Sequence, residues 1–168
     1  MKQYRTLSFR ATQAIGESIA RHIKAQKSKK KIVGKDARKT AQPKHATVFA
    51  LTGELGAGKT TFTQGFLKGF GIKKRAQSPT FIIMRRHGIR SRPHKNIYHV
   101  DAYRLKKAEQ MKVLEFEKIL DDPRNVILIE WPERIKEILP KHATWISFKH
   151  GKKENERIIA VRSGRKNY

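Results

Sequence analysis

The residues best suited to chemistry lie in the run Gly53-Glu54-Leu55-Gly56-Ala57-Gly58-Lys59-Thr60. Its first and last glycines enclose four residues and are followed by a lysine and a hydroxyl residue, which is the Walker A spacing. Such glycines let backbone N–H groups turn toward phosphate oxygens, and the helix that follows adds its positive N-terminal end. Lys59 would reach the β- and γ-phosphates, and the Thr60 hydroxyl would ligate a bridging Mg²⁺ ion. The run, from Gly53 onward, predicts a site for the phosphates of a nucleotide.

Two acidic residues further along the chain each follow a strand-like apolar run. Asp101 ends the run 97–100, and Glu130 ends the run 126–129. Ligands of an open α/β sheet bind at the C-terminal ends of its parallel strands, where carboxylates can hold Mg²⁺ directly or through water. Either acid alone could instead be a helix N-cap or an ion-pair partner. Their joint occurrence after a Walker A run favours a metal site.

Two more residues are candidates for contact with a nucleotide. Thr80, in Ser78-Pro79-Thr80, lies between the Walker A helix and a predicted strand, where its hydroxyl could sense the γ-phosphate or the metal. The same tripeptide is equally compatible with a simple turn. Trp131 directly follows Glu130, so its indole could pack on a ligand or fill the core. The sequence leaves both alternatives open.

Strands and helices have to hold these residues together, and the hydropathy pattern predicts both. Short apolar runs predict strands at 4–9, 47–51, 81–84, 97–100, 126–129, 144–148 and 157–161. Apolar residues at helical spacing predict one helix capped by Ser8, one beginning near Lys59 and one over 108–120. The basic stretch between 84 and 97 is expected to be a loop or hairpin. The alternation predicts an α/β fold, a P-loop NTPase-like three-layer sandwich whose mostly parallel sheet has antiparallel edge strands.

Chain length and local composition predict how the molecule is organised. A chain of 168 residues is about the size of one globular domain, so we expect a single domain over 1–168. A Lys-rich segment at about 24–45 has few large aliphatic residues and is expected to be a mobile, solvated insertion. No apolar run approaches the roughly 20 residues of a membrane helix, so no membrane partner is expected.

Positive charge dominates the composition. Lys and Arg number 39 against 14 Asp and Glu, giving a formal net charge of +25. This charge favours polyanionic partners such as RNA, acidic protein surfaces or nucleotides, although it can also be a general surface property without a dedicated ligand. The absence of cysteine excludes disulfides and thiolate metal sites and indicates the cytoplasm.

Four ordered segments together resemble the TsaE family, the ATPase subunit of the bacterial machinery that makes threonylcarbamoyladenosine in tRNA. They are 51–62, which contains the Walker A run, 78–81 (Ser-Pro-Thr-Phe), 99–105 (His-Val-Asp-Ala-Tyr-Arg-Leu) and 129–133 (Ile-Glu-Trp-Pro-Glu). The Walker A run is common to many proteins, whereas the ordered set is specific. The resemblance covers most of the chain except the Lys-rich segment and the weakly marked C-terminal part.

The resemblance implies an ATPase of low intrinsic activity that uses ATP and Mg²⁺ and works with subunits of the TsaB and TsaD type. Turnover of ATP would support cycling of the threonylcarbamoyl-transferase complex without performing the transfer. Lys59, Asp101 and Glu130 would be catalytic, with Thr60, Asp101 and Glu130 at the metal. The nucleotide contacts would include Thr12 and the phosphate-holding residues Gly56, Ala57, Gly58, Lys59, Thr60 and Thr61.

Other functions fit parts of the sequence. A small-molecule P-loop kinase would need an acceptor pocket and a lid, which Arg85, Arg86, Arg90 and Arg92 could imitate. A GTPase is disfavoured because the chain has no Asn-Lys-x-Asp string. A basic RNA-binding protein would explain the charge but neither the Walker A run nor the strand-end acids. The Lys-rich segment could also add a salt-sensitive contact to the tRNA backbone.

Overall fold

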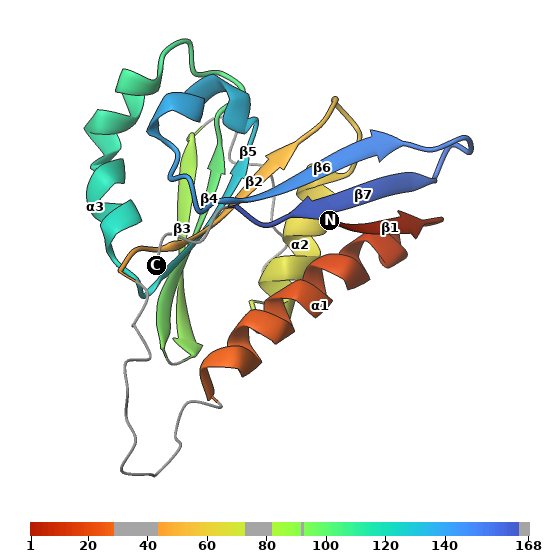
Figure 1. Ribbon diagram of the computed structural model, residues 1–168, viewed down its shortest axis with the longest axis horizontal. Helices are drawn as coiled ribbons and strands as arrows, with labels where there is room; N and C mark the ends of the chain where they lie inside the picture. Colours follow the sequence, from red (N-terminus) through yellow and green to blue (C-terminus); the bar gives the residue numbers. More distant parts are fainter. Residues whose placement is uncertain (29–43, 73–81, 92, 165–168) are drawn as a thin grey trace.

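The computed structural model of this protein describes residues 1–28, 44–72, 82–91 and 93–164. They form a seven-stranded sheet with the order β1-β7-β6-β2-β5-β4-β3 (Figure 1). The strands are β1 (Lys2–Thr6), β2 (Thr47–Thr52), β3 (Met84–Ser91), β4 (His94–Asp101), β5 (Asn125–Glu130), β6 (Thr144–His150) and β7 (Arg157–Arg162).

The centre of the sheet is parallel and its two sides are antiparallel. β2 pairs in parallel with both β5 and β6, and β4 pairs in parallel with β5. β7 and β1 continue the sheet antiparallel on one side, and β3 pairs antiparallel with β4 on the other. The predicted α/β fold with antiparallel edge strands is therefore confirmed. β5 is buried along its whole length, as its unbroken aliphatic run predicts for a strand covered on both faces.

Helices cover both faces of this sheet and produce three layers (Figure 1). The helical segments are α1 (Phe9–Ser28), α2 (Lys59–Gly69), η1 (Ala108–Leu114), α3 (Phe116–Asp121) and η2 (Pro132–Ile138). Successive side chains of β5 enter opposite clusters, since Leu128 lies in the cluster of Phe66 on α2 and Ile129 in that of Phe116 on α3. Within the described residues, no helix combines the length and apolarity needed to cross a membrane.

α1 and α2 touch through glycines. A β-carbon built on Gly16 would lie 2.3 Å from the Phe62 carbonyl oxygen, and one built on Gly65 would lie 1.9 Å from the Gln13 carbonyl oxygen. Real β-carbons do not approach other atoms so closely, so a larger residue would push the helices apart. The two glycines therefore allow the contact that places α1 beside the helix following the Walker A loop.

The N-terminal elements differ from the sequence prediction at their boundaries. The Ser8 Oγ accepts a hydrogen bond from the Ala11 N–H at 3.1 Å, which confirms the predicted N-cap. Because Ser8 caps a helix, β1 ends at Thr6 instead of extending to residue 9. α1 continues to Ser28, so 24–28 of the predicted insertion are helical, consistent with the good helix formers there. Residues 29–43 of that insertion lie outside the described residues.

The basic stretch before β4, predicted as a loop or hairpin, forms the first strand of a hairpin with β4. The predicted strand at 81–84 is instead β3, Met84–Ser91, which pairs with β4 from Met84 opposite Val100 to Ser91 opposite His94. The basic side chains did not indicate a strand, but β3 lies at the edge of the sheet, where alternate residues such as Arg86 and Arg90 remain exposed. Charged residues are common on edge strands because they oppose pairing with other chains.

The predicted helix over 108–120 is broken in two. Glu115 adopts the left-handed conformation with φ 50°, which separates η1 from α3. Met111 and Phe116 are both buried in the same apolar cluster. On a continuous helix, side chains five residues apart would point about 140° away from each other. The break at Glu115 lets both side chains reach the same face of the sheet.

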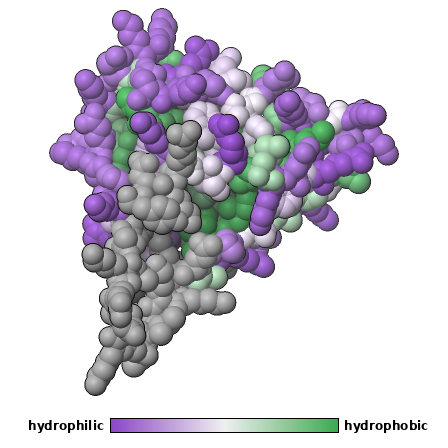
Figure 2. Space-filling view, in the orientation of Figure 1, coloured by the Kyte–Doolittle hydropathy of each residue, from purple (hydrophilic) through white to green (hydrophobic). Residues whose placement is uncertain are grey.

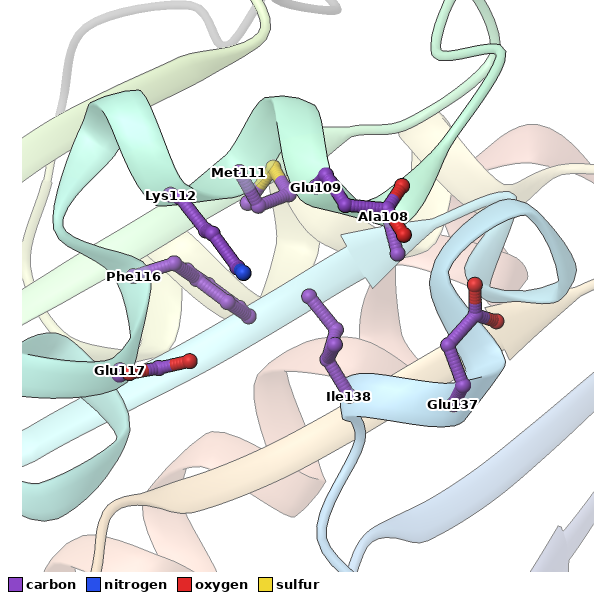
Figure 3. A pocket seen from close by; sticks show the side chains of 8 residues that line it. All are labelled: Ala108, Glu109, Met111, Lys112, Phe116, Glu117, Glu137 and Ile138. Carbon is purple, nitrogen blue, oxygen red and sulfur yellow. The ribbon is translucent and has the colours of Figure 1, made fainter.

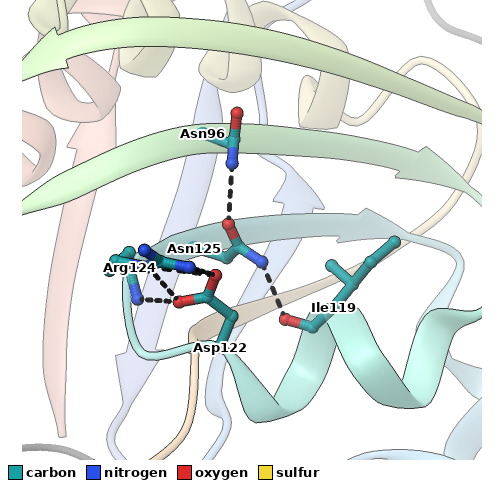
Figure 4. A network of polar contacts seen from close by, with 5 residues as sticks. All are labelled: Asn96, Ile119, Asp122, Arg124 and Asn125. Atoms are coloured by element: carbon teal, nitrogen blue, oxygen red, sulfur yellow. Dashed lines mark hydrogen bonds and ion pairs between the residues drawn. The ribbon is translucent and has the colours of Figure 1, made fainter.

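A polar network holds the start of β5 (Figure 4). The Asn125 side chain donates to the Ile119 carbonyl at 3.0 Å and accepts from the Asn96 amide at 3.1 Å. In the preceding turn, the Arg124 guanidinium donates to both carboxylate oxygens of Asp122. This hydrogen bonding lowers the pKa of Asp122 to about 2. The network fixes where β5 begins, and with it the position of the carboxylate at its other end.

The packing of α1 on α2 gives a testable expectation. Gly65→Ala should lower the free energy of unfolding by about 1–3 kcal/mol, the usual cost of overpacking, because its β-carbon overlaps the Gln13 carbonyl. Gly88→Ala is the control, since a β-carbon there meets no atom within 4 Å. Urea unfolding followed by circular dichroism measures both variants. Equal stability of the two would contradict the close contact at Gly65.

Candidate functional site

The Walker A run forms the connection between β2 and α2. Gly53, Gly56 and Gly58 have φ values of 140°, 73° and 103°, a region that residues with a β-carbon rarely adopt. Gly58 is the N-cap of α2 and provides no side-chain cap, and the first turn contains no acidic residue. The N-terminal N–H groups of a helix have no partner within the helix, so they are available to an anion. The predicted order of strand, glycine loop and helix is confirmed.

Lys59, the first residue of α2, folds back over the loop. Its Nζ donates to the Gly53 carbonyl at 2.6 Å and to the Glu54 carbonyl at 2.8 Å. The same atom lies 3.9 Å from the centroid of the Trp131 ring, a cation–π distance. Trp131 itself has φ 59°, an unusual conformation for a bulky residue. The indole therefore lies at the loop 53–58, the candidate phosphate loop, and also packs against the apolar cluster of Phe116, so both alternatives for Trp131 have structural support.

The charge of Lys59 is held among three carboxylates. Burial lowers the pKa of Lys59 below its ordinary value, while the charges of Glu130, Glu133 and Asp101 act in the opposite direction. The three carboxylates favour the charged form of Lys59 next to the helix N-terminus, where a phosphate would also meet the N–H groups.

Glu130 connects α2 to the middle of the sheet. Its Oε2 accepts a hydrogen bond from the Thr60 hydroxyl at 2.8 Å, and its Oε1 lies 2.8 Å from the Nε2 of His99. Glu130 and His99 are both buried. A carboxylate between a hydroxyl and an imidazole has a fixed orientation, since both of its oxygens are occupied. His99 is thus a site residue that sequence reasoning missed, although alternation in a strand places it on the same face of β4 as Asp101.

Asp101 lies next to Glu130 because β4 and β5 end together. The two acids are paired in the parallel register, and Asp101 is buried. One carboxylate oxygen of Asp101 accepts the Tyr103 N–H at 3.0 Å, and the Tyr103 ring packs on Trp131 with centroids 5.1 Å apart. The predicted juxtaposition of the strand-end acids beside the Walker A loop is therefore present.

These residues surround a hollow of about 280 Å³. It is lined by Leu55, Gly56, Gly58, Lys59, Thr60, Thr61, Asp101, Tyr103, Glu130 and Trp131. Gly53 and buried Ala57 belong to the loop without lining the hollow. Thr12 lies beside the loop, since its Cγ2 would be 3.5 Å from a β-carbon on Gly58, but its hydroxyl bonds to that of Thr6 at 2.8 Å. Thr80 is outside the described residues.

A second hollow, of about 190 Å³, lies between η1, α3 and η2 (Figure 3). Its floor contains the buried side chains of Met111 and Phe116, and Glu109, Glu117 and Glu137 are among its walls. None of the predicted site residues lines it. Lys112 is the one cation in a lining that is otherwise apolar or acidic. Such a lining is poorly matched to a nucleotide phosphate, so the chemistry predicted from the sequence belongs to the first hollow.

The residues of the first hollow fit a phosphate group and a hard cation. The uncapped helix N-terminus and Lys59 supply N–H donors and positive charge, which suit phosphate oxygens. Thr60, Asp101 and Glu130 supply hydroxyl and carboxylate oxygens, the ligands that Mg²⁺ prefers. Within the described ranges, no three His, Cys, Asp or Glu side chains form a group able to hold a metal alone. A cation here would share its ligands with phosphate oxygens and water.

The fold and site can be compared with known proteins. The crystal structure of Bacillus subtilis YdiB superposes with a TM-score of 0.69 and 27% identity, covering 98% of this chain and 86% of that one. A Bacillus subtilis protein named tRNA threonylcarbamoyladenosine biosynthesis protein TsaE is 35% identical over 122 residues, which are 72% of this chain and 73% of that protein. A Haemophilus influenzae protein of the same name is 42% identical over 98 residues, 57% of this chain and 58% of its own length.

The match extends beyond the Walker A loop. The family model described as threonylcarbamoyl adenosine biosynthesis protein TsaE matches residues 7–159. This range contains α1, the phosphate loop, both strand-end acids and most of the hairpin of β6 and β7. The chain therefore belongs to the TsaE family.

Proposed function

We propose that this protein binds ATP with Mg²⁺ in the hollow beside the Walker A loop and hydrolyses it slowly. Hydrolysis supports turnover of the complex that transfers threonylcarbamoyl to an adenosine of tRNA, and this subunit does not perform the transfer. The observation that carries the proposal is the hydrogen bond of 2.8 Å between the Thr60 hydroxyl and Glu130, at the N-terminus of the phosphate-loop helix. A glycine turn with a purely structural role would not require a buried carboxylate at that hydroxyl.

The phosphates of ATP would be held by Lys59 and by the backbone N–H groups from Gly56 to Thr61. The left-handed glycines allow this part of the chain to curve around an anion, and the start of α2 adds its partial positive charge. Lys59 would exchange its hydrogen bonds to the loop carbonyls for bonds to phosphate. Trp131 and Tyr103 would border the same space, and Thr12 and Thr80 are further proposed contacts.

Mg²⁺ would be held by Thr60 and Glu130, with Asp101 at the metal or at the attacking water. When bound, the cation supplies positive charge that neutralises phosphate oxygens. The residues of this chain orient that arrangement: His99 holds one oxygen of Glu130, and the Tyr103 N–H holds one oxygen of Asp101. Each carboxylate oxygen has more than one lone pair, so these acids can also accept a hydrogen bond from water in the hollow.

The partners proposed for this protein are subunits of the TsaB and TsaD type, with tRNA reached through them. The relatives named above carry the name of this tRNA modification, and a cytoplasmic location would follow from it. Hydrophilic residues cover much of the face seen in Figure 2. A direct contact between tRNA and the Lys-rich segment remains a prediction, since 29–43 lie outside the described residues.

The structure gives less support to a kinase. Arg85, Arg86 and Arg90, which could have formed an arginine-bearing lid, are held in β3 at the edge of the sheet. Arg92 is outside the described residues. A lid needs a segment that can close over the phosphates, and a paired strand is not free to do so.

The first prediction concerns nucleotide affinity. Lys59→Ala should weaken ATP binding about 10- to 100-fold, because a charged hydrogen bond contributes roughly 1.5–3 kcal/mol. Lys24→Ala removes the same charge from an exposed position of α1 and is the matched control. Isothermal titration with ATP and Mg²⁺ measures both variants. Equal affinity in both would refute phosphate binding by Lys59.

The second prediction concerns the metal. Glu130→Gln should raise the Mg²⁺ concentration for half-maximal ATP hydrolysis about 10- to 100-fold. Losses of metal affinity of this size are usual when a residue that orients the ligands of a metal is changed. Gln keeps the size of the side chain and can still accept from Thr60, so the fold should be retained. Glu137→Gln makes the same change in the second hollow and should leave the Mg²⁺ dependence unaltered. An unaltered dependence in Glu130→Gln would remove this residue from the metal site.

The third prediction separates the pathway function from simple ATP hydrolysis. Purified TsaB and TsaD type proteins should change the hydrolysis rate of the native chain, and Lys59→Ala should fail to support repeated rounds of tRNA modification. Release of labelled phosphate and threonylcarbamoyl incorporation into tRNA are the two measurements. Transfer of the γ-phosphoryl group to an added small acceptor would instead favour the kinase.

A further inference from the structure

The hairpin formed by β6 and β7 lies against the phosphate loop. We propose that this hairpin is a clamp that sets the conformation of the loop, and that Arg157 and His150 are its positioning residues. The consequence for nucleotide affinity rests on the proposed ATP binding, whereas the clamp itself does not. Sequence reasoning treated this part of the chain as weakly marked and gave it no role at the site.

Arg157 contributes most of the contact. Its Nε and Nη2 donate to the Gly56 carbonyl at 3.3 and 3.1 Å. Its Nη1 donates to the carbonyls of Glu154 and Glu156 at 2.6 and 2.8 Å, within its own hairpin. The guanidinium therefore bridges the hairpin turn and the phosphate loop, with a planar set of donors that lysine cannot reproduce.

His150 holds the neighbouring peptide. Its Nε2 lies 3.3 Å from the Leu55 carbonyl oxygen, and because a carbonyl only accepts, the ring nitrogen is the donor. At the start of the loop, a β-carbon on Gly53 would lie 2.3 Å from the carbonyl oxygen of Phe148 on β6. The hairpin thus contacts the phosphate loop at three places along its length.

Every carbonyl from Gly53 to Gly56 consequently has a donor. Lys59 donates to the first two, His150 to that of Leu55 and Arg157 to that of Gly56. A peptide is planar and usually trans, so fixing the direction of a carbonyl also fixes the N–H of the next residue on the opposite side. Carbonyl oxygens repel phosphate oxygens. Holding the Leu55 carbonyl toward the hairpin therefore turns the Gly56 N–H to the opposite side, which suits a loop that binds an anion. The Ala57 N–H, which follows the Gly56 carbonyl, donates to the Glu54 carbonyl at 3.2 Å and closes the turn of the loop.

The hairpin turn is itself firmly held. The Glu156 carboxylate is nearly fully buried, pairs with Arg5 of β1 and accepts the Lys153 N–H at 3.2 Å. Hydrogen bonding from Arg5 holds the pKa of Glu156 below its ordinary value. Backbone bonds from Gly151 to Glu156 and from Glu156 to Lys153, both 2.9 Å, close the turn. A turn fixed in this way can define the place of Arg157 against the loop.

The test uses the full chain without nucleotide first. In protein labelled with ¹⁵N-glycine, Arg157→Gln and Arg157→Lys should both shift or broaden the amide resonances of Gly56 and Gly58. The resonances of Gly16 and Gly88, which lie away from the loop, should not change. Arg162→Gln is the matched control, because Arg162 is exposed on the same strand. His150→Gln provides a milder second variant should either change at Arg157 impair folding.

Nucleotide affinity is measured next by titration with ATP and Mg²⁺. Both changes at Arg157 should weaken binding about tenfold, as expected for loss of charged hydrogen bonds that order the loop. Unchanged Gly56 and Gly58 resonances in the Arg157 and His150 variants would overturn the clamp. Full affinity in Arg157→Lys with loss in Arg157→Gln would also overturn it, since Arg157 would then act only through its charge. If the native chain bound no ATP, the proposed function would be wrong. The Gly56 and Gly58 resonances would still show whether the hairpin sets the conformation of the loop.

Discussion

A loop that binds an anion through backbone N–H groups must keep its own carbonyl oxygens turned away from that anion. In this protein His150 and Arg157 hold the Leu55 and Gly56 carbonyls from a hairpin about a hundred residues later in the chain. Lys59, on the helix that follows the loop, holds the Gly53 and Glu54 carbonyls. The loop has left-handed glycines and would otherwise have many accessible conformations. Its geometry therefore depends on the sheet that brings these donors together.

The parallel centre of the sheet also positions the two strand-end acids. β4 and β5 end in register, so Asp101 and Glu130 are neighbours although 28 residues separate them. His99 and Thr60 then occupy the two oxygens of Glu130. The polar network at the other end of β5 contributes indirectly, because it determines where that strand starts. The strand registers thus bring together the phosphate loop, the two carboxylates and the rings of Tyr103 and Trp131. No separate local arrangement is needed for each of them.

Local sequence patterns predicted an element correctly wherever one short-range interaction dominates. The apolar run of β5, the Ser8 cap and the glycine turn before Lys59 each have a local physical cause, and each was predicted. Where packing outweighed local preference, the prediction was open or wrong: 84–97 could be a loop or a hairpin, and one helix was expected over 108–120. The basic residues of β3 are tolerated because an edge strand leaves one side exposed, and the helix over 108–120 is interrupted at Glu115 because Met111 and Phe116 both reach one cluster. Neither cause can be recognised in a window of neighbouring residues.

The sequence by itself determined the Walker A loop, the two strand-end acids and the family, since these depend on residue type, spacing and order. Only the tertiary structure decided that His99 orients Glu130, that Trp131 lies over Lys59, and that Arg157 and His150 hold the loop carbonyls. Such contacts join residues 31 to 101 positions apart. Their partners are selected by strand order and register, which arise from burial of both faces of the sheet and leave no short-range mark in the chain.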